Sequence, residues 1–370
     1  MKLNNLFLYV GIQKTASSSI QETLFQNRDL LGENNFLYPK NWTKWHVSEI
    51  GALMYKEKEE ERRNILHRAN FTQLDRDNII NRLKEEIKVS NCENLILSAE
   101  SIILYSSNGL KELKRIINEE LSINKIKIVI STRNPIDFMN SFSQQLIKSS
   151  FKSSIEKLEE RLHYKTQIIK FEEIFGKENI ILYSFEEAKK NKNGIMGQFL
   201  EKINFPKDKI KEIKVYKQNE GISDISCDLI EYINQKEPFI VNNEISKNRK
   251  IGDTRLLHTL SGNKYVIEES EQKQICKEII DDILWLKSNY NIDYTDMKYI
   301  QKPIIKFTNS NISEIEKIYL KLNKNIQNYI GKYFFDKLKK TKIYDIKSQI
   351  ILRKILKTIK NQKGVDVGTI

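Results

Sequence analysis

Cysteine, proline and glycine are all scarce in this chain, whose 370 residues include 3 Cys, 5 Pro and 13 Gly. The cysteines are far apart and odd in number, at Cys92, Cys227 and Cys276. This pattern does not fit a disulfide framework or a zinc site, and it favours a protein of the reducing cytoplasm. With so little proline and glycine, no stretch of the sequence stands out as a linker.

Long hydrophobic runs are also missing. No run of 18 apolar residues is present, so we expect no transmembrane helix. The first residues, MKLNNLFLYVGIQ, hold a short apolar stretch and no small-residue cleavage site, which favours a first β-strand over a signal peptide. Hydrophobic residues nevertheless make up 39% of the sequence and are spread along it, which is enough for a sizeable core.

Positive charge is concentrated at one end of the chain. The formal net charge is +13, and residues 301–370 hold 16 Lys and Arg against 5 Asp and Glu. The first 300 residues are therefore nearly neutral, which argues against a nucleic-acid partner. We predict one domain at residues 1–300 and a basic helical C-terminal extension at residues 301–370.

Short apolar runs alternate with segments of helical periodicity over the first 205 residues. The runs that predict strands are 5–12, 35–39, 94–100, 125–133 and 179–187. Residues 153–174 predict one long helix or two, and strand signals fade beyond about residue 210. This alternation predicts a three-layer α/β fold, in which helices flank both faces of a mostly parallel central sheet, followed by a helical C-terminal region.

The first predicted strand leads through GIQKTASSS, at 11–19, into a predicted helix. Free backbone N–H groups and the positive end of the helix dipole meet at such a turn, which therefore binds phosphate readily. Lys14 adds a positive charge, and hydroxyl donors come from Thr15, Ser17 and Ser18. The triphosphate loop G-x-x-x-x-G-K-[ST] and the dinucleotide fingerprint G-x-G-x-x-G are both absent. The structural alternative is an ordinary turn with serine caps.

A second turn with similar chemistry follows the strand predicted at 125–133. The sequence IVISTRNPIDFMNS places Arg133 at the strand end and Ser141 eight residues later. An arginine binds phosphate oxygens through two parallel hydrogen bonds. Pro135 is suited to the first position of the next helix and would direct Ser141 back toward the turn. The alternative is an arginine in a local ion pair and an unrelated surface serine.

Taken together, the two turns resemble the donor-binding motifs of sulfotransferases that use 3′-phosphoadenosine 5′-phosphosulfate (PAPS). In that family, a loop reading roughly G-x-x-K-[ST]-G-[ST]-[ST] follows the first strand. Ala16 stands where the family usually has glycine. An alanine needs ordinary backbone angles there, so we expect the geometry of the loop to be affected but not its charge. The chain matches the family's loop at Gly11, Lys14, Thr15, Ser17 and Ser18.

The second motif of the family is an arginine at a strand end with a serine eight residues on, which together hold the 3′-phosphate of the donor. Arg133 and Ser141 match it. Weaker similarity to the bacterial carbohydrate-sulfotransferase branch extends over about residues 4–295. NRKIGD, at 248–253, is similar to the family's R-K-G-x-x-G-D loop, with different spacing, and would add Arg249 and Lys250.

The resemblance implies a P-loop-like fold and a PAPS-dependent sulfotransferase acting on a hydroxyl of a carbohydrate: a glycan, a capsule or a glycolipid. The product of the donor is 3′-phosphoadenosine 5′-phosphate (PAP). Lys14 would neutralise the charge that grows on the leaving phosphate oxygen. Because that group is not a polyphosphate chain that needs Mg²⁺, no metal is implied. The resemblance assigns donor binding to Gly11, Gln13, Lys14, Thr15, Ala16, Ser17, Ser18, Arg133 and Ser141.

The acceptor hydroxyl needs a general base, for which there are two candidates. His46 follows the second short strand, where a histidine recurs in the family, and its ordinary pKa is near neutral. Glu100 ends the strand NLILSAE, and the carboxyl ends of parallel strands face the crevice where ligands bind. We prefer His46 as the base, with Glu100 as its orienting partner or as the alternative base. A packing histidine and a helix-capping carboxylate are the structural alternatives.

Two other functions compete with sulfuryl transfer. A small-molecule kinase would need a Mg²⁺-binding aspartate at a strand end, which NLILSAE and KIKIVISTR lack. A membrane- or partner-binding adaptor with a decayed active site is supported only by Ala16. PAP should bind the sulfotransferase, ATP with Mg²⁺ the kinase, and neither the adaptor.

The tail contains a basic amphipathic helix in KSQIILRKILKTIKNQK, at 347–363. Leu352, Ile355 and Ile359 belong to an apolar stripe, and lysines and Arg353 occupy the opposite face. In one interpretation the stripe packs on the rest of the protein. In the other the helix lies on an anionic membrane at its inner face, where it would bring the enzyme to a lipid-linked or surface-bound glycan.

Overall fold

The structure is a computed structural model of the whole chain, and it describes residues 3–54, 73–149, 154–217, 221–241, 244–341 and 345–363. The chain divides into two compact units. The sheet unit comprises Met1–Pro135, Leu162–Asn219 and Ile279–Met297, and the helical unit comprises Ile136–Arg161, Glu220–Glu278 and Lys298–Ile370. The domain boundary expected near residue 300 stays a prediction.

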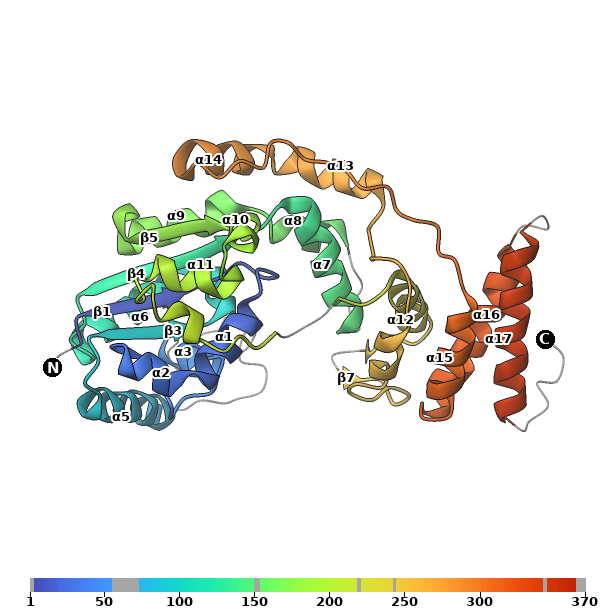
Figure 1. Cartoon of the computed structure of the whole chain (residues 1–370), viewed down its shortest axis with the longest axis horizontal. Coiled ribbons are helices and arrows are strands. Elements are labelled where there is room, and N and C mark those ends of the chain that lie inside the picture. The colour runs from blue at the N-terminus through green and yellow to red at the C-terminus, as the bar shows by residue number, and fades with distance from the viewer. Residues whose placement is uncertain are drawn as a thin grey trace. The chain divides into compact units, whose positions relative to one another are not determined.

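Five parallel strands form the sheet of the sheet unit (Figure 1), which confirms the predicted α/β fold class. Their order is β2-β3-β1-β4-β5, so β1 lies between β3 and β4 and all three end at the same edge. The bounds are β1 Asn5–Tyr9, β2 Phe36–Leu37, β3 Asn94–Ser98, β4 Lys125–Thr132 and β5 Ile180–Ser184.

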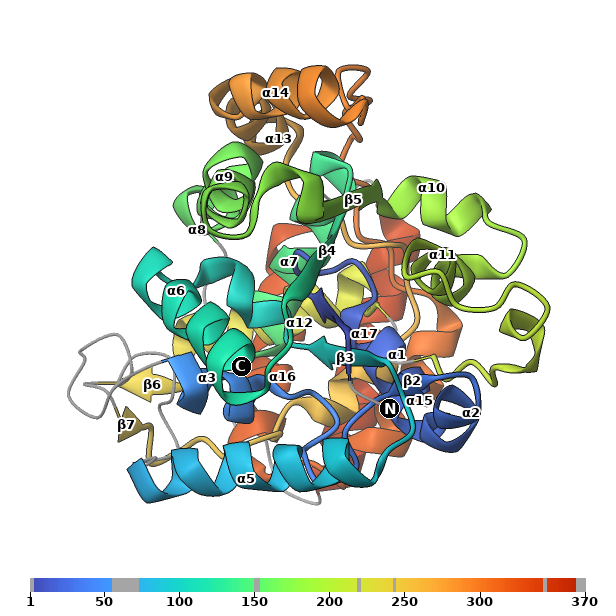
Figure 2. The same cartoon turned by 90° about the vertical axis from the view of Figure 1, so that its left-hand side faces the viewer.

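Helices cover both faces of this sheet (Figure 2). One face carries a core cluster in which the ring of Tyr9 meets that of Phe199 at 5.2 Å between centroids. The helices on that face are α1 Ser17–Gln26, α2 Arg28–Glu33, α10 Phe185–Lys190 and α11 Gly194–Lys202. The other face carries α3 Val47–Met54, α5 Gln73–Val89, α6 Ser107–Arg115 and α9 Tyr164–Phe175. Helix α14, Ile280–Tyr290, packs on α9.

Short helical turns follow several strands of the sheet unit. The turn η1, Glu100–Leu104, comes directly after β3, and the π-helical turn η2, Ile116–Glu120, extends α6. Two further turns are η3 Lys177–Asn179 and η4 Ile210–Glu212. The region 153–174 contains two helices, α8 Ile155–Glu160 and α9, which was one of the two arrangements predicted.

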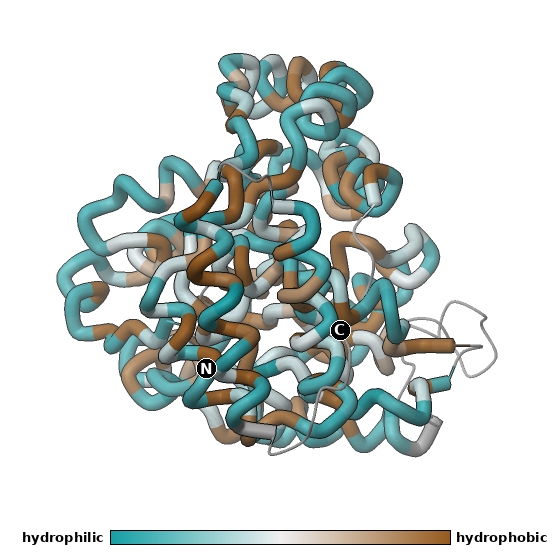
Figure 3. Tube along the Cα trace, turned by 90° about the vertical axis from the view of Figure 1, so that its right-hand side faces the viewer, coloured by the Kyte–Doolittle hydropathy of each residue, from teal (hydrophilic) through white to brown (hydrophobic). Residues whose placement is uncertain are grey.

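Helices build the helical unit. The described residues beyond 210 contain one small hairpin, β6 Ile240–Val241 with β7 Glu244–Ile245, in agreement with the fading strand signal. The tube in Figure 3 alternates between hydrophobic and hydrophilic stretches, as expected for amphipathic helices. The helices are α7 Pro135–Lys148, α8, α12 Asp224–Lys236, α13 Glu269–Glu278, α15 Asn309–Tyr319, α16 Lys324–Lys340 and α17 Ile346–Lys363, with the turn η5 Arg255–Thr259.

The predicted basic helix of the tail is α17, and it packs against α15 and α16. Leu352, Ile355 and Ile359 are buried there, whereas Arg353 and Lys354 are exposed. The apolar stripe is therefore covered by protein. None of the described helices is long and apolar enough to cross a membrane.

Candidate functional site

Three connections meet at the carboxyl edge of the sheet, because β3, β1 and β4 are neighbours. The chain leaving β1 stays paired with β4: Val10 N donates to Val129 O at 2.8 Å and Ile12 N to Ser131 O at 3.2 Å. Beyond this pairing, Arg133 Nη1 donates to the carbonyl oxygen of Lys14 at 2.6 Å. The structure therefore brings the two predicted phosphate-binding turns together.

The turn before α1 has an unusual backbone. Lys14 and Ala16 both lie in the left-handed region, with φ of 68° and 65°. Our expectation that an alanine would need ordinary angles here is wrong, because Ala16 adopts the conformation that suits the family's glycine. Its carbonyl accepts from Ser19 N at 2.9 Å and Ile20 N at 3.0 Å, which starts α1. The left-handed conformation costs an L-residue about 1–2 kcal/mol.

Gly11 is required by space rather than by its backbone angles. A Cβ atom at Gly11 would lie 2.5 Å from Tyr9 Oη and 3.0 Å from Ser17 Oγ. Both contacts are closer than ordinary van der Waals distance, and the ring of Tyr9 is fully buried. Gly11 therefore lets the turn lie directly on the end of β1.

Hydroxyl groups support the turn from below. Thr15 Oγ1 donates to Ile12 O at 2.6 Å and accepts from Ser131 Oγ at 2.8 Å. Ser131 Oγ also lies 3.1 Å from Tyr9 Oη. Because Thr15 is fully buried, its hydroxyl holds the shape of the loop and does not face a ligand. Tyr9 and Ser131 were not predicted from the sequence, although polar residues at the ends of buried strands were a usable signal.

The other loop positions differ in exposure. Gln13 and Ser18 are half-buried, whereas Ser17 is buried. Gln13 Oε1 is buried and accepts no hydrogen bond within the described part of the chain. The N–H groups of Ser17 and Ser18 belong to the first turn of α1, where no intrahelical acceptor exists. These groups suit a phosphate, because it can receive several N–H donors at once.

Glu100 is the first residue of η1, at the end of β3, and it is half-buried beside Lys14 and Ser17. Burial raises the pKa of its carboxyl group, while the charge of Lys14 and the hydroxyl of Ser17 lower it, and the net direction is upward. A carboxylate with a raised pKa is a better proton acceptor near neutral pH. The structure thus brings a cation and a tuned carboxylate together.

His46 lies beside β3 but is fully buried. Its ring stacks on Tyr38 at 4.4 Å between centroids and meets the edge of Trp42 at 5.4 Å. Nδ1 accepts from the backbone N of Ser98 at 3.2 Å, so the hydrogen of the neutral ring is on Nε2. Burial lowers the pKa of His46 to about 3.

This environment bears on the choice of base. Nε2 of His46 is buried and has no hydrogen-bond partner within the described ranges. As an N–H it can donate a hydrogen bond, but it has no lone pair with which to take a proton. The geometry therefore favours Glu100, which was the alternative base, while the assignment itself stays a prediction.

Arg133 is held by aromatic groups of the sheet unit. Its guanidinium lies 4.9 Å from the centroid of the Phe185 ring, and its carbonyl accepts from Tyr164 Oη at 2.6 Å. Tyr294 Oη contacts Thr132 Oγ1 at 2.9 Å and donates to Glu186 at 3.1 Å. These aromatic residues were not predicted, because they come from three different segments of the chain.

Ser141 lies on α7, in the helical unit, and is half-buried there. Its pairing with Arg133 on one phosphate stays a prediction. Arg249 also belongs to the helical unit, and its buried guanidinium donates to Asp253 at 2.7 Å and to Glu237 O at 2.7 Å. A ligand would have to replace these contacts. Lys250 is exposed.

Within the described ranges, no group of three or more His, Cys, Asp or Glu side chains is placed to hold a metal ion. Cys92, Cys227 and Cys276 are buried free thiols.

No family model matches the chain, and no curated protein matches it. Two solved structures are similar to it. A sulfotransferase from Alicyclobacillus acidocaldarius shares 14% identity over 79% of this chain and 97% of that chain, with a TM-score of 0.45. A retinol dehydratase in complex with androsterone and inactive cofactor PAP shares 14% identity over 81% of this chain and 83% of that chain, with a TM-score of 0.31. Both similarities are distant, so a function has to rest on the residues of the site.

Proposed function

We propose that this protein is a sulfotransferase that uses PAPS as donor and a carbohydrate hydroxyl as acceptor. The observation that carries the proposal is the hydrogen bond from Arg133 to the Lys14 carbonyl. It links two cationic turns at one edge of the sheet, with Glu100 beside Lys14. A donor with separate 5′ and 3′ anionic groups needs two such cationic turns.

The residues present fit the donor. Gly11 lets the turn lie against the end of β1, and the N–H groups of Ser17 and Ser18 lie in the first turn of α1, where an anion can accept hydrogen bonds from them. Lys14 would hold the 5′-phosphosulfate, and Arg133 with Ser141 would hold the 3′-phosphate. Bound PAPS supplies the sulfuryl group that is transferred.

Side chains of the protein accept the proton of the acceptor and stabilise the charge that develops on the donor. Glu100 accepts the proton of the acceptor hydroxyl, because its raised pKa leaves it basic enough to do so. The Nε2–H of His46 remains a neutral donor. Lys14 stabilises the negative charge at the phosphate end, and such preorganised charge is worth about 10²–10³ in rate.

The test is donor binding by the full-length chain. PAP should raise the melting temperature, and the Lys14→Ala variant should lose turnover by about 10²–10³ while it keeps most of that shift. Lys40→Ala is the matched control, because Lys40 is an exposed partner of Asp29. A shift with ATP and Mg²⁺ alone would point to a kinase, and no shift with either ligand would point to an adaptor.

The acceptor class rests on the resemblance and is tested by a screen of glycans with labelled donor.

The proposed contact with an anionic membrane involves fewer residues of α17 than the sequence suggested, because the apolar stripe of this helix is buried. Only its exposed cations, such as Lys354 and Lys357, would then touch the surface. Binding to anionic vesicles should be weak and should vanish at high salt.

A further inference from the structure

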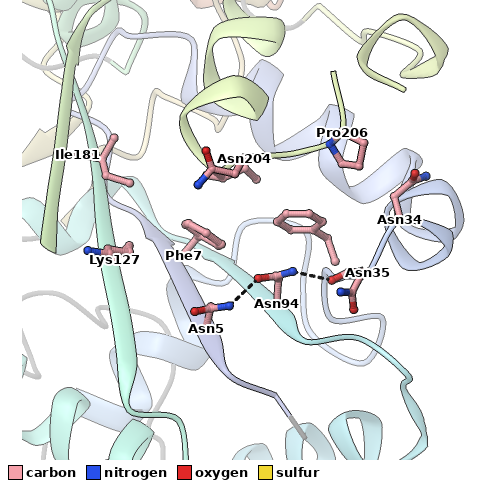
Figure 4. Close-up of a pocket in the computed structure, with 11 residues that line it drawn as sticks. Asn5, Phe7, Asn34, Asn35, Asn94, Lys127, Ile181, Asn204 and Pro206 are labelled. Carbon is pink, nitrogen blue, oxygen red and sulfur yellow. Dashed lines mark hydrogen bonds between the residues drawn. The ribbon is translucent and has the colours of Figure 1, made fainter. Parts of the chain in front are cut away.

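A cavity lies at the other end of the same sheet. Its volume is about 490 Å³, and it is lined by residues that begin strands: Asn5 on β1, Phe36 on β2 and Asn94 on β3 (Figure 4). The turns with Lys14, Glu100 and Arg133 follow the opposite ends of these strands. The volume falls in the range of pockets that hold small molecules.

Amide groups dominate the polar lining of this cavity. Asn5 Nδ2 donates to Asn94 Oδ1 at 2.9 Å, and Asn94 Nδ2 donates to Asn35 O at 3.1 Å, as the dashed lines in Figure 4 show. This chain of hydrogen bonds fixes the orientation of the amides, and none of the described residues donates a hydrogen bond to Asn5 Oδ1. Preorganised polar groups are the ones that give a pocket its selectivity.

Asn204 contributes an amide of a different kind. It is exposed, lies in the left-handed region with φ of 59°, and makes no side-chain hydrogen bond to the described residues. In Figure 4 it lies between Ile181 and Pro206, at the side of the cavity opposite Asn5. The cavity is thus flanked by amides on two sides.

The rest of the lining is apolar and cationic. Phe7 and Phe36 belong to it, with ring centroids 6.1 Å apart. Lys127 is its one ionic group among the described lining residues, and its Nζ is held by Glu178 O at 3.0 Å. No carboxylate from the described ranges lines the cavity.

We propose that this cavity binds a neutral sugar ring. Each amide both donates and accepts hydrogen bonds, and so does each sugar hydroxyl, whereas a lining of charges would offer only one of these roles. Phe7 and Phe36, which are 7% and 4% exposed, offer a small apolar contact to such a ring, and Lys127 adds a donor. The proposal does not depend on sulfuryl transfer, because none of the residues of the donor site lines the cavity.

The test is ligand-observed saturation-transfer NMR on the full-length protein. The probes are the methyl glycosides of glucose, galactose, mannose and N-acetylglucosamine. Uracil represents the alternative ligand class, flat rings that carry amide groups. At least one glycoside should receive saturation. Asn204→Gly should weaken its binding about three- to tenfold, as expected for the loss of one or two hydrogen bonds.

Asn291→Gly is the matched control, because Asn291 is also exposed and left-handed, with φ of 55°, but lies outside the cavity. Glycine keeps the backbone of both positions unstrained. Ile181→Trp, which fills the cavity, should abolish the signal if thermal unfolding shows that the variant folds. Glu100→Gln should leave the signal intact, which separates this site from an acceptor site at the other edge.

Three outcomes would overturn the proposal: saturation of uracil but of no glycoside, no saturation at all, or equal weakening by Asn204→Gly and Asn291→Gly. The proposed use of PAPS would stand whatever the result, because PAP binding at the other edge of the sheet tests it separately.

Discussion

Two residues with left-handed backbone, Lys14 and Ala16, give the loop after β1 its shape. The strain at Ala16 is tolerated because neighbouring hydrogen bonds fix the backbone of the loop. The Thr15 hydroxyl donates to Ile12 O and accepts from Ser131 Oγ, and the Ala16 carbonyl accepts the first hydrogen bonds of α1. Strain of this kind often occurs at ligand sites, where a preformed loop avoids the cost of ordering on binding.

The Ala16→Gly variant should therefore be more stable than the natural protein. Glycine relieves about 1–2 kcal/mol of strain and costs roughly 0.5–1 kcal/mol in chain entropy, so we expect a net gain of up to about 1.5 kcal/mol in the free energy of unfolding. Urea denaturation measures it. Ala188→Gly, inside α10, is the control and should lose about 1–2 kcal/mol, because it lowers helix propensity and removes a buried methyl group. If both variants had a lower free energy of unfolding than the natural protein, the backbone at Ala16 would not be strained.

The choice between the two candidate bases makes a prediction about pH. If Glu100 is the base, turnover rises with pH through its raised pKa, because only the carboxylate accepts a proton. Glu100→Gln should then abolish turnover and keep PAP binding. His46→Asn should keep much of the activity, since an asparagine carbonyl can accept from Ser98 N and tolerates the φ of 51° at this position.

The opposite pattern would restore His46 as the base. Loss of turnover in His46→Asn with activity retained in Glu100→Gln, at equal melting temperatures, would show that His46 takes the proton despite its burial.

At the scale of elements, the connection from β4 to α7 positions Arg133, and α17 packs on α15 and α16. The turn after β4 positions Arg133 through its own carbonyl, which Tyr164 holds, and through the face of Phe185. The guanidinium of Arg133 is therefore held in place where it donates to the Lys14 carbonyl. A side chain that binds phosphate needs such a fixed position.

Arg133→Ala should weaken PAP far more than adenosine 5′-phosphosulfate, which lacks the 3′-phosphate. The loss of charge-assisted hydrogen bonds predicts about a tenfold to hundredfold effect on PAP. Isothermal titration of both ligands measures the ratio. Arg115→Ala, on the exposed side of α6, is the control. Equal losses for both ligands would mean that Arg133 only holds the loop.

The packing of α17 predicts a contrast between two of its residues. Leu352 is buried and Ile350 is 47% exposed. Leu352→Ala should destabilise the protein by about 2–4 kcal/mol because it leaves a cavity, whereas Ile350→Ala should change stability by less than about 0.5 kcal/mol. Urea unfolding compares them. Similar values for the two variants would indicate that α17 does not pack as described.

Most of the elements could be predicted from the sequence, because hydrophobic periodicity is a local property. The runs at 94–100 and 125–133 became β3 and β4, with the last residues of each run continuing into the site. The contacts that build the site could not be predicted. The hydrogen bond from Arg133 to Lys14 joins residues that are far apart in sequence, and the handedness of Ala16 depends on its neighbours.

At the scale of the whole molecule, donor binding should slow amide exchange mainly in the sheet unit, because Ser141 is the one proposed donor-binding residue that lies in the helical unit. The turns that carry Lys14, Glu100 and Arg133 all belong to the sheet unit, and a ligand slows the local opening of the segments it contacts. With PAP bound, amide hydrogen exchange should slow at residues 10–18, 98–102 and 130–135, while the exchange of α15 to α17 stays the same. Slowing confined to the helical unit would place the nucleotide elsewhere.

The chain enters and leaves each unit more than once, so a truncation of the chain removes part of a unit and not the whole of it. Ending translation near residue 300 would discard α16 but keep α12, whose Tyr232 ring packs 5.4 Å from that of Tyr333. The face of α12 that packs on α16 would then be exposed to solvent. Fragments with an exposed apolar face tend to aggregate. A protease-resistant or crystallisable piece is therefore better sought among fragments that keep both α12 and α16 than among fragments that end near residue 300.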